Sequence, residues 1–537
     1  MKWVTNRLFW ADLCWFAAMF GLCMGVGQAL LAGSSVLPFG DETIHLRKIF
    51  ALQGWLAEAD STVEKFRLMA LSGDAYPNVQ YCFSQLFLSG ERSIEHARLA
   101  QVALSALHAG IGVTIGRTLW GRPAAAAYVA IACFSPLILA YGQRCFIDVA
   151  LVSVVGIALL FGEASDGFRR PGHTFGFVLW SAASLLVKWT ALVWLTVPGL
   201  FFCYRAIIAS STVSQVRVGY AFRLLGLLGV SVASIFVASR LNPSTDWRAD
   251  NLNGLVHLMV MVFGLLVATW AAFGAKRSPI ERCVASVTAI VMMAGPWYAS
   301  HFHFLLDRLS HETLVASLEV GRSSSDVSDG IETLRMMVPA GELLLVFGFG
   351  VALWVRKASL FPAARVLGAT VGGVLTVVFL PFNGRYFLPV VPLLAGAIVM
   401  PWVALSRSKQ WALSAAVIGM VVTLSSGATF VPARADPLRY TWATNRVSVE
   451  YPLLPFGVGR VPAPMTSTEL ADWLDELEGA CTGPVCRAKL NSPVLFLQER
   501  GLEVVAMTRG IDLRFVQPCV GRTLSLGALS SSLTVCD

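Results

Sequence analysis

Long apolar runs separated by short polar stretches make up most of the first 430 residues of the chain. A helix that crosses a bilayer needs about 20 largely apolar residues, and by that measure we count about thirteen spanning segments. They fall at residues 9–33, 99–117, 123–140, 147–162, 174–188, 190–204, 223–240, 253–273, 284–299, 336–355, 364–381, 386–405 and 411–430. The pattern therefore predicts an all-α polytopic membrane protein.

The distribution of basic residues predicts the orientation. With the N-terminus in the cytoplasm, the inside loops hold roughly seventeen Lys and Arg residues and the short outside loops about five. Arg365 falls in one of the inside loops. The alternation of inside and outside loops also requires two separate spans that meet at Lys188, because a single bent helix there would invert the side of every later loop. The first apolar run is of spanning length, which favours a retained span over a cleaved signal peptide.

The outside face carries the bulkier polar segments. Residues 37–98 form the first outside loop, in which we expect amphipathic helices lying on the membrane rather than a flexible linker. Its apolar positions at helical spacing are Phe50, Leu52, Trp55, Leu56, Phe66, Met69 and Leu71. A second outside loop, about residues 301–335, is polar and is either a lid or a linker.

The composition becomes soluble in character after residue 430, which predicts a transmembrane module (1–430) and a small α+β extracytoplasmic domain (431–537). A capping box at Thr466–Glu469 predicts a helix over Leu470–Leu477. Short strands are predicted at 494–497, 504–506 and 513–516. Four cysteines lie in this region, and an even number in an oxidising compartment predicts two disulfides, the alternative being unpaired thiols. They are Cys481, Cys486, Cys519 and Cys536.

Composition supports the membrane interpretation. Hydrophobic residues make up 56% of the chain and charged residues only 14%, and the mean hydropathy is +0.65. These values exclude an ordinary soluble protein. The net charge of +8 does not indicate nucleic-acid binding, because basic residues of membrane proteins collect in cytoplasmic loops.

Ionisable and aromatic polar residues collect at the predicted outside ends of the spans. They are Asp41, Glu42, His45, Asp74, Tyr76, Arg144, Asp148, Lys188 and Arg385. Transporters usually place such groups near the membrane midplane, where we count few charges in this chain. A cluster at the boundary suits an enzyme whose substrate is a lipid with a charged head group at that depth.

Transfer of a sugar from a lipid phosphate needs a carboxylate base and cations that hold the leaving phosphate. Asp41 is the candidate base, and Arg144, Lys188 and Arg385 are candidate phosphate ligands. Each also has a simpler interpretation. Asp41 and Asp148 suit the positive end of a helix dipole, and the cations suit anchors that reach the interface. His45 is interpreted as a side chain satisfied at the interface, not as a metal ligand.

Five stretches in order resemble the integral-membrane GT-C glycosyltransferases, especially the protein O-mannosyltransferase and lipid A aminoarabinose transferase groups. The resemblance covers about residues 9–430. Its motifs are the acidic pair Asp41-Glu42, the Tyr-Pro segment 74–81, the Arg-x-x-x-Asp at 144–148, the Leu-Leu-x-Lys stretch 185–192, and the Arg-Tyr-x-x-Pro-x-x-Pro stretch 385–392. Asn78 departs from the family pattern, in which a second proline often follows Pro77.

The resemblance implies a polyprenyl-phosphate sugar donor, inversion at the anomeric carbon, and a plasma-membrane location with the site on the outer face. It implies Asp41 as catalytic base, with Glu42 supporting it. It also implies phosphate contacts from three cations, and we expect four further residues to support the site, although His45 departs from the family by standing near a commonly aromatic position. The cations are Arg385, Lys188 and Arg144, and the supporting residues are Asp148, Tyr76, Tyr386 and His45. Some relatives use a divalent metal, and the sequence does not decide the point.

Two other functions remain open. A lipid-linked glycan ligase or oligosaccharyltransferase would transfer a long glycan, so the size of the transferred group discriminates. A lipid or glycan flippase or transporter would move cargo without cleaving a bond. The absence of repeated halves and the few midplane charges disfavour transport.

Overall fold

The structure is a computed structural model. It describes residues 7–32, 41–71, 77–88, 92–142, 144–211, 226, 229, 251–274, 278–301, 365–372, 388–430, 439–441, 448–450, 467–481, 485–491, 499–509, 511–515, 521–525 and 532–536. For some of these residues, Asp41 and Cys536 among them, the description covers the backbone alone.

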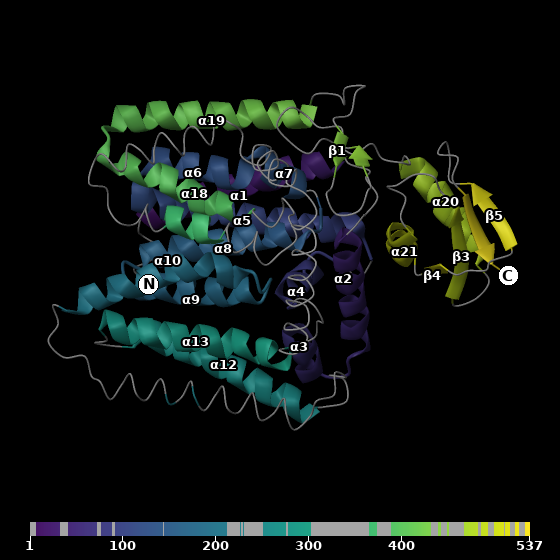
Figure 1. Ribbon diagram of the computed structural model, residues 1–537, viewed down its shortest axis with the longest axis horizontal. Helices are drawn as coiled ribbons and strands as arrows, with labels where there is room; N and C mark the ends of the chain where they lie inside the picture. Colours follow the sequence, from purple (N-terminus) through teal and green to yellow (C-terminus); the bar gives the residue numbers. More distant parts are fainter. Residues whose placement is uncertain are drawn as a thin grey trace.

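Apolar helices lie side by side in a bundle (Figure 1). They are α1 (Arg7–Ala32), α5 (Ile94–Trp120), α6 (Arg122–Phe134), α7 (Pro136–Gly142), α8 (Ile147–Ala164), α9 (Pro171–Leu185), α10 (Ala191–Ser211), α12 (Asn251–Phe273), α13 (Pro279–Ser300), α18 (Val390–Val399), the short helix η2 (Met400–Ala404) and α19 (Arg407–Phe430). Residues 365–372 are also helical.

The predicted spans agree with these helices in most places. The predicted break at Lys188 is confirmed, because α9 ends at Leu185 and α10 begins at Ala191. The span predicted at 123–140 is not one continuous helix, since Ser135 adopts an extended backbone and Pro136 starts a new helix. The spans predicted at 223–240 and 336–355 and the loop at 301–335 lie almost wholly outside the described residues.

Four described helices are long and apolar enough to cross a membrane, at Trp10–Leu31, Ile94–Trp120, Ile147–Ala164 and Ala191–Ser210. Three shorter apolar helices lie at Arg122–Phe134, Leu258–Phe273 and Val390–Ala404. The chain is therefore a multi-pass membrane protein, and the count of about thirteen spans stays a prediction.

Helix α8 forms the centre of the bundle. In its most apolar window 94% of the residues are buried, against 17% in α1. A helix that is apolar on every face is expected at such a central position. Helix α1 lies on the outside and packs closely on α5, because a side chain at Gly27 would collide with Val102 and one at Gly110 with Phe16.

Three further helices lie at one end of the bundle: α2 (Asp41–Glu58), α3 (Thr62–Leu71) and α4 (Val79–Gln85). Helix α2 runs crosswise to the bundle helices in Figure 1. The predicted amphipathic helices of the first outside loop are thus confirmed as helices. Helix α2, however, buries Leu46, Ile49 and Phe50 against protein instead of lying on lipid. In α3, Phe66 is exposed and remains available to lipid.

The C-terminal part holds two sheets and two helices, and the larger sheet lies with both helices to the right of α2 in Figure 1. Strands β1 (Arg439–Thr441) and β2 (Ser448–Glu450) form an antiparallel pair. A second sheet has the order β4-β3-β6-β5, with β3 parallel to β4 and the other pairs antiparallel. Its elements are α20 (Ser467–Ala480), β3 (Val485–Asn491), α21 (Glu499–Thr508), β4 (Asp512–Phe515), β5 (Gly521–Ser525) and β6 (Ser532–Cys536).

The helix predicted over Leu470–Leu477 is confirmed within α20, and the strand predicted at 513–516 is confirmed over Leu513–Phe515. The strand predicted at Val504–Ala506 is wrong, because these residues lie in α21. Leu502, Val505 and Ala506 follow the i, i+3, i+4 spacing of one helix face and are buried. Parallel strands such as β3 and β4 also need a crossover, and α21 supplies it. The strand predicted at 494–497 lies outside the described residues.

Candidate functional site

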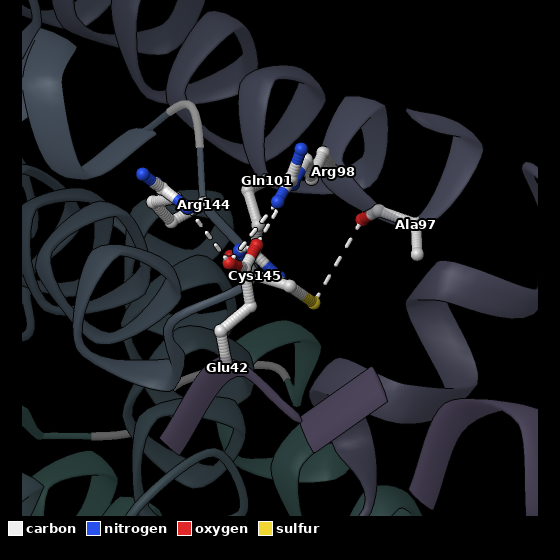
Figure 2. Close-up of polar contacts among 6 residues, drawn as sticks. All are labelled: Glu42, Ala97, Arg98, Gln101, Arg144 and Cys145. Carbon is white, nitrogen blue, oxygen red and sulfur yellow. Dashed lines mark hydrogen bonds and ion pairs between the residues drawn. The ribbon is translucent and has the colours of Figure 1, made fainter. Parts of the chain in front are cut away.

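Glu42 joins the start of α2 to the bundle. Its side chain is fully buried and accepts four hydrogen bonds (Figure 2). Arg98 donates from Nε to Oε1 at 2.8 Å and from Nη2 to Oε2 at 3.1 Å. Arg144 Nη1 donates to Oε2 at 3.2 Å, and the Cys145 backbone N–H donates to Oε1 at 2.9 Å. We call these contacts the Glu42 clamp.

The clamp ties together three segments that are distant in sequence. Arg98 is in the second turn of α5, after the Ser93 side chain caps that helix by accepting from the His96 N–H at 3.2 Å. Arg144 and Cys145 form the turn between α7 and α8. Asp41 is the first residue of α2 and immediately precedes Glu42. The clamp therefore fixes the backbone that carries Asp41 against α5 and the α7–α8 turn.

The electrostatics of the clamp keep Glu42 ionised. Burial alone would raise the pKa of this carboxyl. The charges of Arg98 and Arg144, with the hydrogen bonds from Arg98 and Cys145, outweigh burial and hold the pKa of Glu42 below its ordinary value. Glu42 is thus a permanent anion at neutral pH, with both oxygens engaged.

Asp148 and Lys188 form a second buried ion pair. Lys188 Nζ donates to Asp148 Oδ1 at 2.6 Å, and the two side chains are 3% and 4% exposed. Asp148 is in the first turn of α8, where a carboxylate suits the helix dipole. Lys188 lies in the turn between α9 and α10. Asp148 follows Cys145 by three residues, so residues 144–148 supply partners to both ion clusters.

His45 lies one turn along α2 from Glu42 and contacts a different partner. Its Nδ1 is 2.9 Å from the hydroxyl of Tyr81 on α4. Helix α4 in turn meets the Lys188 turn, because the Val79 N–H donates to the Leu186 carbonyl at 3.3 Å. Within the described part of the chain, no three His, Cys, Asp or Glu side chains form a group that could hold a metal ion.

Several predicted site residues cannot be placed with side chains. Asp41 is described by its backbone alone, and Tyr76, Arg385 and Tyr386 lie outside the described residues. Of the candidate disulfide cysteines, Cys481 and Cys486 are joined to each other. Cys519 lies outside the described residues, and Cys536 is described by its backbone in β6.

Arg98 and Tyr81 are the site residues that sequence reasoning missed. A signal for Arg98 was present, because a charged residue four positions inside a spanning helix is costly unless it has a partner. Tyr81 lay within the Tyr-Pro segment, but spacing alone gave no partner for it.

Arg365 was counted among the loop residues, but residues 365–372 are helical. The inside orientation of this end stays a prediction. The Arg365 side chain is fully buried within the bundle and forms an ion pair with Glu163 near the end of α8. Glu163 is about 22 Å along α8 from Asp148, taking about 1.5 Å per residue. The two buried ion pairs of α8 thus lie near its two ends and not at its middle, so the argument from few midplane charges is unchanged.

The protein is thus a multi-pass membrane protein with a charged site at one end of its helix bundle. Two buried ion clusters form this site, and one of them includes Lys188 in the turn between α9 and α10. No protein-family model matches the sequence, and no curated protein sequence matches it either. Two solved structures that match the chain are crystal structures of ArnT from Cupriavidus metallidurans, one bound to undecaprenyl phosphate and one in the apo state. They share 15% and 14% identity with this chain, with TM-scores of 0.35 and 0.31. Each match covers 94% of this chain and 86% of the ArnT chain.

Proposed function

We propose that the protein is a membrane glycosyltransferase. It moves a sugar from a polyprenyl-phosphate donor to a lipid, glycan or protein acceptor, with inversion at the anomeric carbon. The N-terminus is cytoplasmic, the site is on the outer face of the plasma membrane, and residues 431–537 form a periplasmic domain. The five motifs given above support this class of reaction.

The Glu42 clamp is the observation that carries the proposal. It holds the start of α2, and so the backbone of Asp41, beside Arg144 at the end of the bundle. The Arg-x-x-x-Asp motif at 144–148 joins this clamp to the Asp148–Lys188 pair. Three of the five motifs, otherwise far apart in sequence, thus meet through these contacts, and the hydrogen bond from Val79 to Leu186 joins the Tyr-Pro segment to them.

The clamp also indicates different roles for the two acidic residues, Asp41 and Glu42. Glu42 has both oxygens bonded to cations or a backbone N–H, and its lowered pKa makes it a poor proton acceptor. It is therefore the positioning residue, and Asp41 is the base. This division agrees with the supporting role that the family resemblance implies for Glu42.

The reaction is a single displacement. The acceptor hydroxyl oxygen attacks the anomeric carbon while the bond from that carbon to the phosphate oxygen breaks. Asp41 takes the hydroxyl proton, and the bonding electron pair leaves with the polyprenyl phosphate. Arg144, Lys188 and Arg385 stabilise the charge that grows on the phosphate. A lysine ammonium has three N–H donors, so Asp148 can hold Lys188 in place while a phosphate oxygen accepts from it.

Comparison of the glycolipids and glycoproteins of cells with and without the gene tests the proposal and identifies the sugar. The purified protein is then given that sugar on undecaprenyl phosphate, the lipid named for one of the ArnT structures. We expect transfer of one sugar and release of undecaprenyl phosphate. Transfer of a long glycan would favour a ligase, and translocation in proteoliposomes without bond cleavage would favour a flippase. Either result would overturn the proposal.

A further inference from the structure

Arg365 is a buried cation with contacts from several helices. Its Nε donates to Glu163 Oε1 on α8, and its Nη1 donates to the Pro392 carbonyl on α18 at 2.7 Å. Its guanidinium carbon is 6.0 Å from the centroid of the Trp120 ring at the end of α5. A charge in this setting is costly unless it is paired, and Glu163 supplies the pairing.

The chain makes room for Arg365 at α18. A Cβ at Gly396 would collide with the guanidinium, so only glycine at this position lets the arginine lie against the helix. Gly396 follows Pro392 by one helical turn. The side chain therefore lies along the first two turns of α18 and is held there by a carbonyl at one end and a carboxylate at the other.

The start of α18 lies near the candidate site. Leu388, which precedes α18, belongs to one buried cluster with Ile138 of α7 and with Val149 and Val152 of α8. Val149 is the neighbour of Asp148, whose partner is Lys188. The first turn of α18 and the first turn of α8 are thus packed together where the second ion pair is formed.

We propose that the Glu163–Arg365 pair is a positioning device for the site. It fixes α18 along α8, and so sets the distance between the start of α18 and the Asp148–Lys188 pair. One carboxylate at each end of α8 then holds a cation from a different part of the chain. The consequence for donor binding rests on the proposed function, whereas the consequence for α18 does not.

An apolar double variant, Glu163→Leu with Arg365→Met, separates positioning from folding. Buried ion pairs replaced by apolar residues of similar size often leave stability unchanged. We expect the variant to melt as the wild type does. The amides of residues 388–393 should exchange with deuterium at least tenfold faster, and undecaprenyl phosphate should bind about tenfold more weakly.

Two controls make the result decisive. Arg514→Gln removes an exposed pair with Asp512 and should alter neither readout. If the double variant does not fold, Glu163→Gln takes its place, with exchange over 388–393 as the readout. Wild-type exchange in a folded variant would overturn the inference. Wild-type protein that does not bind undecaprenyl phosphate would instead overturn the proposed function, and the exchange result would still stand.

Discussion

Arg98 forms a bidentate ion pair with Glu42, which lies 56 positions earlier in the chain: Nε donates to one carboxylate oxygen and Nη2 to the other. Both side chains are almost fully buried. This contact fixes the orientation of α2 on the bundle. Because Asp41 begins α2, the geometry of the proposed base depends on an arginine that belongs to a different helix.

Replacement of Arg98 by Leu should therefore be strongly destabilising. It leaves the Glu42 carboxylate buried without its main partner, and loss of one member of a buried pair costs about 3–5 kcal/mol. The melting temperature in detergent measures the effect. Arg47→Leu is the matched control, since its pair with Glu503 is half exposed and is expected to contribute at most about 1 kcal/mol. Equal losses in the two variants would contradict the clamp.

The clamp should also give a defined acid sensitivity. The pKa of Glu42 in the folded state lies below its ordinary value of 4.5. A depressed carboxyl pKa contributes stability that is fully present above 4.5 and is lost as the pH falls through the folded-state value. We expect Glu42→Gln to remove part of the acid-induced fall in melting temperature and to leave its slope between pH 6 and 8 unchanged. If Glu42→Gln changed the pH dependence of the melting temperature only near neutral pH, the lowered pKa of Glu42 would be contradicted.

The Asp148–Lys188 pair allows structure and function to be separated. Lys188→Met should destabilise the protein, because it leaves the Asp148 carboxylate in a buried place without that ammonium. The double variant Asp148→Asn with Lys188→Met should recover stability but not donor binding. We expect its KM for the lipid donor to stay raised about tenfold. Recovery of both properties would show that Lys188 has no contact with the donor.

Gly396→Ala should have a large effect for a single methyl group. The added Cβ would occupy the place of the Arg365 guanidinium and push it from Glu163 and Pro392. We expect a loss of about 1–3 kcal/mol, the usual cost of overpacking a core. The loss should shrink in a background where Arg365 is Ala and Glu163 is Leu, which a double-mutant cycle of melting temperatures measures. Additive losses would contradict the collision.

The sequence predicts the class of fold and the level of the site, but not its pairings. Alternation of basic loops located the break at Lys188, because a charged residue between two short apolar runs has a topological consequence. The same rule did not reveal the burial of Arg365, since counting charge per loop cannot detect a partner 202 positions away on another helix. Arg98 was missed for a related reason: its partner is fixed only when α2 folds back on α5.

Local patterns were less reliable in the C-terminal domain. Val504 and Val505 favour a strand by composition, but the burial of Leu502, Val505 and Ala506 follows a helical face. The parallel pairing of β3 and β4 decides the matter by requiring a crossover between them. That pairing is a long-range contact which no short stretch of sequence reveals.

Transfer by an Asp41→Asn variant tests whether Asp41 is the catalytic base. The measurement is the rate of release of undecaprenyl phosphate from its sugar conjugate, in protein whose melting temperature equals that of the wild type. We expect a rate at least about 100-fold lower, because a general base contributes about that factor or more. Asp60→Asn, a change at an exposed carboxylate between α2 and α3, should retain the wild-type rate. A wild-type rate in folded Asp41→Asn protein would contradict the role of Asp41 as the catalytic base.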